Sequence, residues 1–113
     1  MSELEPVEIP MYYFNDLTPA EAERVALLVE ECGEIIQMGG KILRHGYESV
    51  NPFDGVNALT NRQRLQNEIG DLRAVIKLMI HNNDMLEGEI IVATQAKFKR
   101  MEPWLHHQLS LPE

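Results

Sequence analysis

Two pairs of acidic residues have the spacing that places two side chains on one face of a helix. Glu31 and Glu34 are three residues apart, and so are Glu68 and Asp71. Residues at this spacing are neighbours on a helix surface. Carboxylates held close together raise each other's pKa and need a cation to compensate them. Since Mg²⁺ binds through oxygen ligands, the two pairs predict a metal site if their helices pack antiparallel.

The second pair lies at the border of the apolar face of its helix. On a helical wheel, Val75 points between the directions of Glu68 and Asp71. Arg62 and Arg64 are the nearby cations, and they are too few to neutralise all the acids. Either pair alone is also compatible with a solvated helix surface, so the metal site depends on both pairs meeting.

Three main helices are predicted to position these residues. A capping box with proline at the first helical position, in residues 18–21, predicts a helix that runs to about His45. A second capping box, in residues 60–63, opens a helix that runs to about His81. A third helix is expected over residues 85–101, so the predicted fold class is all-α.

Glycine and asparagine residues predict the interruptions. The glycine pair 39–40 predicts a kink or break in the first helix, and residues 46–59 predict a loop. Residues 82–84 (Asn-Asn-Asp) predict a break and the cap of the third helix. Gly33 and Gly70 each precede an acidic residue, and we expect them to allow close helix approach around the metal.

Length and composition favour one small domain without an internal disulfide. The 113 residues carry 18 acidic and 10 basic side chains, a net charge of -8, which argues against nucleic-acid binding. We expect an irregular arm at 1–17, the domain at 18–105 and a tail at 106–113. Cys32, the one cysteine, is expected to be a buried small hydrophobe. Without an apolar run of membrane-spanning length, a soluble cytoplasmic protein is expected.

The acidic motifs also carry a family resemblance. Residues 30–34 (EECGE) match E-E-x-x-E and residues 68–71 (EIGD) match E-x-x-D. Together they resemble the MazG-like all-α nucleoside triphosphate pyrophosphatase superfamily, over about residues 18–101. The stretches KILRHGYESVNP and TNRQRLQNEIGD are similar to small phage-encoded members, including those that hydrolyse dGTP in phages making 2-aminoadenine DNA. The resemblance implies a MazG-like helical bundle, and the host cytoplasm if the chain is phage-encoded.

The resemblance implies an activity and a ligand set. The expected enzyme cleaves a nucleoside triphosphate between its α- and β-phosphates, giving a monophosphate and pyrophosphate, with a deoxynucleotide such as dGTP as substrate. It implies that Mg²⁺, or Mn²⁺ in its place, is bound by Glu31, Glu34, Glu68 and Asp71. Glu30, Glu31 and Glu34 are the catalytic candidates, one of which would accept the proton of the attacking water.

Five further residues are candidate substrate contacts, each with a structural alternative. Lys41 and Arg44 lie beyond Glu34 and could clamp phosphates, or they could be surface cations. Asn61 could touch phosphate or sugar, or support a helix cap. Asn83 could contact the base edge, or form a turn. Trp104 could stack on the base, or pack as a hydrophobic residue.

The first helix is apolar on more than one side, which predicts a homodimer or homotetramer with sites near the subunit interface. Two alternative functions share these features. Phosphoribosyl-ATP pyrophosphohydrolase is a related short all-α enzyme that would use the same acidic pairs. A non-catalytic helical module would instead use its acidic face to bind a basic partner.

Overall fold

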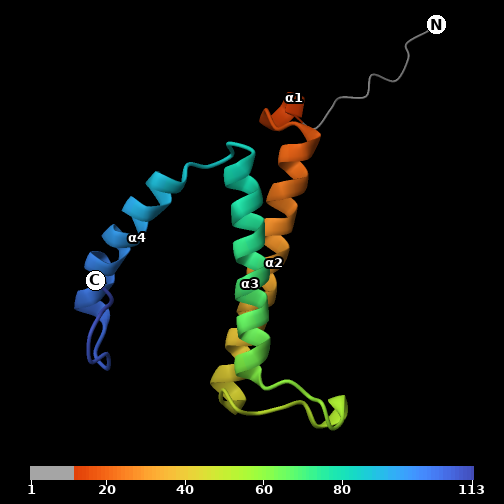
Figure 1. Cartoon of the computed structure of the whole chain (residues 1–113), viewed down its shortest axis with the longest axis vertical. Helices are drawn as coiled ribbons and strands as arrows, with labels where there is room; N and C mark the ends of the chain where they lie inside the picture. Colours follow the sequence, from red (N-terminus) through yellow and green to blue (C-terminus); the bar gives the residue numbers. More distant parts are fainter. Residues whose placement is uncertain (1–11) are drawn as a thin grey trace, which may run out of the picture. The chain divides into compact units, whose positions relative to one another are not determined.

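The structure is a computed structural model that describes residues 12–113, in which helices are joined by loops and no strand is present (Figure 1). The predicted all-α fold class is therefore confirmed. The chain divides into two compact units, one ending at Leu78 and the other beginning at Met79. We describe each unit by itself. No helix in the described residues has the length and apolarity needed to cross a membrane.

The first unit opens with a short helix, α1 (Tyr12–Asn15). The prediction that residues 1–17 form an irregular arm is wrong for these four residues, whereas residues 1–11 lie outside the described part. The turn ends where Asp16 adopts a positive φ of 59°. Asn15 Oδ1 then accepts a hydrogen bond from the Leu17 N–H at 3.0 Å.

The long helix α2 (Pro19–His45) begins with the predicted capping box. Thr18 Oγ1 accepts from the Glu21 N–H at 3.1 Å, and Glu21 Oε1 accepts from the Thr18 N–H at 2.8 Å. Gly46, at φ 85°, ends the helix and donates its N–H to the Ile42 carbonyl at 2.7 Å. Of the kink or break predicted at residues 39–40, the break is wrong, because α2 continues through both glycines. Glycine destabilises a helix by about 1 kcal/mol per residue relative to alanine. The packing of a long helix against its neighbour can offset this cost.

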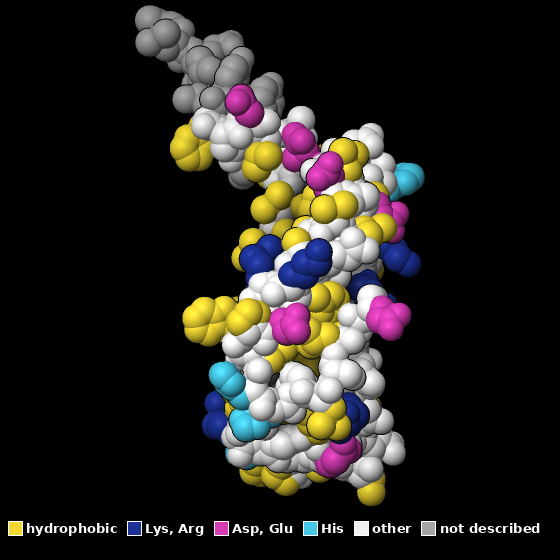
Figure 2. Space-filling view, turned by 90° about the vertical axis from the view of Figure 1, so that its left-hand side faces the viewer, with side chains coloured by type: hydrophobic (Ala, Val, Ile, Leu, Met, Phe, Trp, Pro, Cys, Tyr) yellow, Lys and Arg dark blue, Asp and Glu magenta, His cyan; other side chains and the backbone are white. Residues whose placement is uncertain are grey.

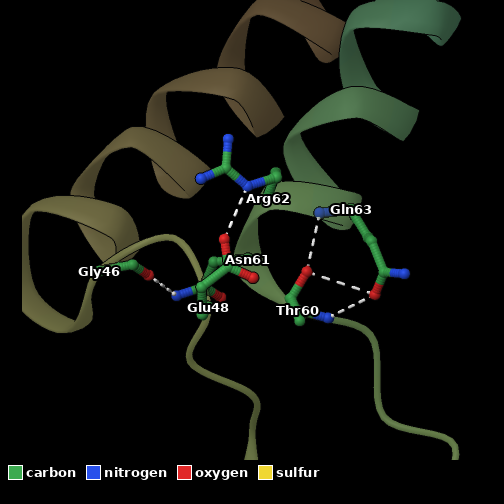
Figure 3. Close-up of polar contacts among 6 residues, drawn as sticks. All are labelled: Gly46, Glu48, Thr60, Asn61, Arg62 and Gln63. Carbon is green, nitrogen blue, oxygen red and sulfur yellow. Dashed lines mark hydrogen bonds and ion pairs between the residues drawn. The ribbon is translucent and has the colours of Figure 1, made fainter.

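A loop with one turn of 3₁₀ helix, η1 (Pro52–Asp54), leads from α2 to α3 (Asn61–His81). The second capping box forms as predicted: Thr60 Oγ1 accepts from the Gln63 N–H at 3.1 Å, and Gln63 Oε1 accepts from the Thr60 N–H at 2.9 Å (Figure 3). The buried Asn61 side chain ties the two ends of the loop, because its Nδ2 donates to the Gly46 carbonyl at 3.1 Å.

Within this unit α2 and α3 run antiparallel and side by side (Figure 1). Met38 and Val75 are its buried hydrophobic residues, at 6% and 8% exposure. No large side chain in the described residues is fully buried. Figure 2 shows many hydrophobic side chains at the surface between charged ones. The first unit is therefore a helical hairpin with a very small core of its own.

The second unit contains α4 (Glu87–Met101) and a 3₁₀ turn, η2 (Glu102–Trp104). The cap predicted at residues 82–84 is wrong, because Leu86 occupies the N-cap and makes no side-chain cap bond. Asn83, at φ 63°, instead closes the preceding helix, donating its N–H to the Ile80 carbonyl at 3.0 Å. The Asp84 N–H donates to the Met79 carbonyl at 2.9 Å, which completes a Schellman-type helix end.

Candidate metal centre

The antiparallel pairing of α2 and α3 brings the two acidic pairs together. Glu31, Glu68 and Asp71 each place one carboxylate oxygen within 4.8 Å of the other two. Glu34 lies beside them, because its carboxyl group interacts directly with that of Glu68. Glu31, Glu34 and Glu68 are half-buried, whereas Asp71 is exposed. We call these four residues the acidic cluster.

The acidic cluster raises the pKa of two of its own members. The pKa of Glu31 lies above its usual value of 4.5, first because of burial and then because of the charges of Glu34, Asp71 and Glu30. The pKa of Glu34 is also raised, first by a hydrogen bond to Glu68 that favours its protonated form and then by the negative charge of Glu68. Both shifts indicate carboxylates that are crowded by one another.

Two oxygens in the acidic cluster are buried without a hydrogen-bond partner. They are Glu31 Oε2 and Glu68 Oε2. A buried carboxylate oxygen that accepts no hydrogen bond is unfavourable, since it has lost water and gained nothing in return. These two oxygens therefore have neither a cation nor a hydrogen-bond donor among the described residues.

The two arginines nearest in sequence to the second acidic pair bind other carboxylates. Arg62 Nε donates to Glu48 Oε1 at 2.7 Å (Figure 3), and its guanidinium lies 4.4 Å from the centre of the Tyr47 ring. Arg64 forms an ion pair with Asp54. These pairings hold the loop against the start of α3, so both guanidinium groups already have carboxylate partners outside the acidic cluster.

Glu30 and the two glycines beside the acids have different surroundings from those expected. The Glu30 side chain is exposed and affects the acidic cluster through its charge on Glu31. A Cβ atom built on Gly33 or Gly70 would meet nothing within 4 Å. The expected close approach of helices at these glycines is therefore wrong within a single chain.

A cavity of about 280 Å³ opens where α2 ends and α3 begins. Three cationic side chains line it: Lys41, Arg44 and Arg64. Lys41 and Arg44 are two of the predicted substrate contacts. Lys41 is seven residues beyond Glu34, a rise of roughly 10 Å along the helix. Arg64 is one helical turn before Glu68, and that spacing is the signal by which the sequence could have indicated it. The full lining is Lys41, Arg44, His45, Ser49, Val50, Asn51, Pro52, Asn61 and Arg64.

The other predicted substrate contacts have structural roles or lie in the second unit. Asn61 lines the cavity, but its amide also holds the Gly46 carbonyl. Asn83 forms the turn that ends α3, in agreement with its structural alternative. Trp104 is 78% exposed in η2. Because Asn83 and Trp104 belong to the second unit, their contact with substrate stays a prediction.

No protein-family model, curated protein or solved structure matches this chain.

Proposed function

We propose that this protein is a Mg²⁺-dependent nucleoside triphosphate pyrophosphohydrolase of the MazG-like type. It would convert a deoxynucleoside triphosphate, with dGTP as one candidate, into the monophosphate and pyrophosphate. The main support for the proposal is that two buried carboxylate oxygens have no hydrogen-bond partner. They are Glu31 Oε2 and Glu68 Oε2.

The acidic cluster fits a hard divalent cation. Its oxygens come from two helices, and three of them lie within 4.8 Å of one another. Glu31, Glu34, Glu68 and Asp71 would hold Mg²⁺, and Mn²⁺ could replace it because it prefers similar ligands. When bound, the metal would neutralise triphosphate charge and polarise the α-phosphorus.

The protein's own side chains would bind the substrate and accept a proton. Lys41 and Arg44 line the cavity at the end of α2 and can hold phosphate oxygens, lysine as a point charge and arginine as a fork. One of the catalytic candidates Glu30, Glu31 and Glu34 would accept the proton of the attacking water.

The proposed enzyme is a homodimer or homotetramer in the cytoplasm. The small core of the first unit supports self-association, because Met38 and Val75 alone bury little apolar surface. A second copy would also help enclose a substrate that is larger than the cavity.

A substrate panel with two variants tests this proposal. Each nucleoside and deoxynucleoside triphosphate, and phosphoribosyl-ATP, is incubated with the protein and Mg²⁺ while substrate loss is followed. We expect turnover of a deoxynucleotide, and loss of turnover and Mg²⁺ binding in Glu34→Gln and Asp71→Asn, with helical content unchanged. Turnover of phosphoribosyl-ATP alone would identify the related histidine-synthesis enzyme. A protein that neither turns over substrate nor binds Mg²⁺ would contradict the proposal and favour an interaction module.

A further inference from the structure

The cavity at the end of α2 is positively charged, although the chain as a whole is strongly acidic. Lys41, Arg44 and Arg64 line it, and no acidic side chain is among the described residues that do so. They are three of the 10 lysine and arginine residues in a chain of net charge -8. His45 also lines the cavity and adds a positive charge when it is protonated. The cavity therefore favours an anionic ligand.

The charge and the size of the cavity suit a diphosphate group. Lys41 and Arg44 are exposed, and neither forms an ion pair with a described residue. A single phosphate group carries a charge of about −1.5 to −2, so three cations match two linked phosphates better than one. The volume of about 280 Å³ lies just below the range of roughly 300–1,000 Å³ typical of pockets for drug-sized ligands. It suits a small anion, or one end of a nucleotide.

The third cation, Arg64, already binds a carboxylate of the loop. It forms an ion pair with Asp54 of η1, and the two side chains are 33% and 34% exposed. Asp54 does not line the cavity, but it holds the guanidinium that a ligand in the cavity would need. Ion pairs with this much contact with solvent contribute little to stability. A diphosphate, which carries more negative charge than one carboxylate, can therefore take the place of Asp54.

We propose that this cavity binds a diphosphate group without a metal, and that Asp54 holds Arg64 until the diphosphate displaces it. The group has two possible sources, free pyrophosphate and the terminal phosphates of a nucleoside triphosphate. These sources rest on the proposed function, whereas the binding itself needs neither a metal nor turnover. When Arg64 moves to the ligand, η1 loses its ion pair with α3.

Isothermal titration with pyrophosphate, in EDTA and at physiological ionic strength, tests the binding site. We expect Arg64→Gln to weaken binding at least about tenfold, because it removes a charged bidentate donor from the cavity. Arg62→Gln is the matched control, since Arg62 also pairs with a loop carboxylate, that of Glu48, but does not line the cavity (Figure 3). The control should stay within about threefold of the wild-type affinity, because salt screens charges outside the site.

The variant Asp54→Asn tests the competition for Arg64. We expect it to tighten pyrophosphate binding about three- to tenfold, because the guanidinium is then free to bind the ligand. Glu48→Gln removes the same charge from another part of the loop and should change the affinity less than about twofold. In an Arg64→Gln background, Asp54→Asn should no longer tighten binding, because the two residues act through one contact.

Hydrogen exchange in the wild-type chain decides the matter even if a variant fails to fold. The Asp54 N–H donates to the Asn51 carbonyl at 3.1 Å. We expect pyrophosphate to speed exchange at this amide, because η1 loses its ion pair, whereas a ligand that only stabilised the fold would slow it. Exchange that is unchanged or slower would overturn the displacement of Asp54.

Competition between ligands identifies the source of the diphosphate. In EDTA, dGTP and pyrophosphate should compete for one site, with the tighter ligand as the source, and dGMP should bind at least about tenfold more weakly than either. The inference is overturned if the wild-type chain binds no pyrophosphate without metal, if dGMP binds as tightly as dGTP, or if Arg64→Gln or Asp54→Asn matches its control. If pyrophosphate binds but Mg²⁺ supports no turnover of any nucleotide, the proposed function fails and the binding site stands.

Discussion

Glu31 and Glu68 each hold one buried carboxylate oxygen that accepts no hydrogen bond. Such an oxygen has lost its water and needs a positive partner. The arginines of the neighbouring segment bind Glu48 and Asp54 instead, so they do not supply that partner. Under the proposed function, a divalent cation would supply that positive charge where the four acids from two helices meet.

At this scale, we predict that Glu68→Gln lowers Mg²⁺ affinity at least about tenfold, because the change removes a charged ligand. The matched control is Glu23→Gln, an exposed glutamate on α2 outside the acidic cluster. Isothermal titration of both variants with Mg²⁺ measures the effect. Equal affinities in the two variants would exclude Glu68 from the metal site.

The stability of the metal-free protein should also depend on pH. Because the pKa values of Glu31 and Glu34 are raised above 4.5 in the folded state, their ionisation favours the unfolded chain. Their contribution to the free energy of unfolding is therefore largest below pH 4.5 and falls as pH rises through the raised values. Urea unfolding across this range with EDTA should show the decline, and Mg²⁺ should reverse it. A decline that Mg²⁺ leaves unchanged would contradict the account.

At the scale of elements, short sequence motifs correctly predicted where the two long helices begin. The capping boxes at Thr18 and Thr60 marked the starts of α2 and α3, because each is complete within four residues. The helix α1 has no such signal in its four residues. Asn83 was ambiguous, since the same residue type serves a cap or a left-handed helix end.

The parts of the candidate site that the sequence missed depend on tertiary structure. The cavity forms where the loop leaves the end of α2 and returns to the start of α3, and Ser49 and Asn51 line it from that loop. The spacing of residues predicts which side chains share a face of a helix. It does not predict which apolar face is covered by another helix. The exposed Cys32 is the clearest example, because its wheel position alone predicted a buried residue.

For the loop, we predict that Asn61→Ala destabilises the protein by about 1–3 kcal/mol, because it removes the bond to Gly46 and leaves a carbonyl without that donor. Asn57→Ala, an exposed residue of the same loop, should change the free energy of unfolding by less than about 0.5 kcal/mol. Urea unfolding compares the two. Similar values for both would show that the Asn61 amide does not hold the loop.

For the whole molecule, we proposed an assembly from copies of one chain, because the first unit has a small core of its own. The assembly would place Glu31 and Glu34 on a helix that is covered on both faces. The surplus of acidic residues would then have two parts, a cluster that binds a cation and a solvated remainder.

Two glycines test whether the proposed assembly uses the side of α2 on which Cys32 and Ile36 are exposed. Gly33 and Gly70 have equal space around them within the chain, but Gly33 lies beside Cys32 on α2, whereas Gly70 lies on α3. Gly70→Leu should therefore keep or raise the thermal midpoint, since leucine favours a helix by up to about 1 kcal/mol over glycine. Gly33→Leu should lower the midpoint and make it depend more strongly on protein concentration. A stabilising Gly33→Leu would argue against a partner helix there.

The most direct test of the central claim is the identity of the phosphorus products. The protein is incubated with Mg²⁺ and each deoxynucleoside triphosphate, and the products are separated by anion-exchange chromatography. The account predicts equal amounts of deoxynucleoside monophosphate and pyrophosphate, from the wild-type chain and not from Asp71→Asn. Release of inorganic phosphate with a nucleoside diphosphate, or no reaction with any nucleotide, would contradict it.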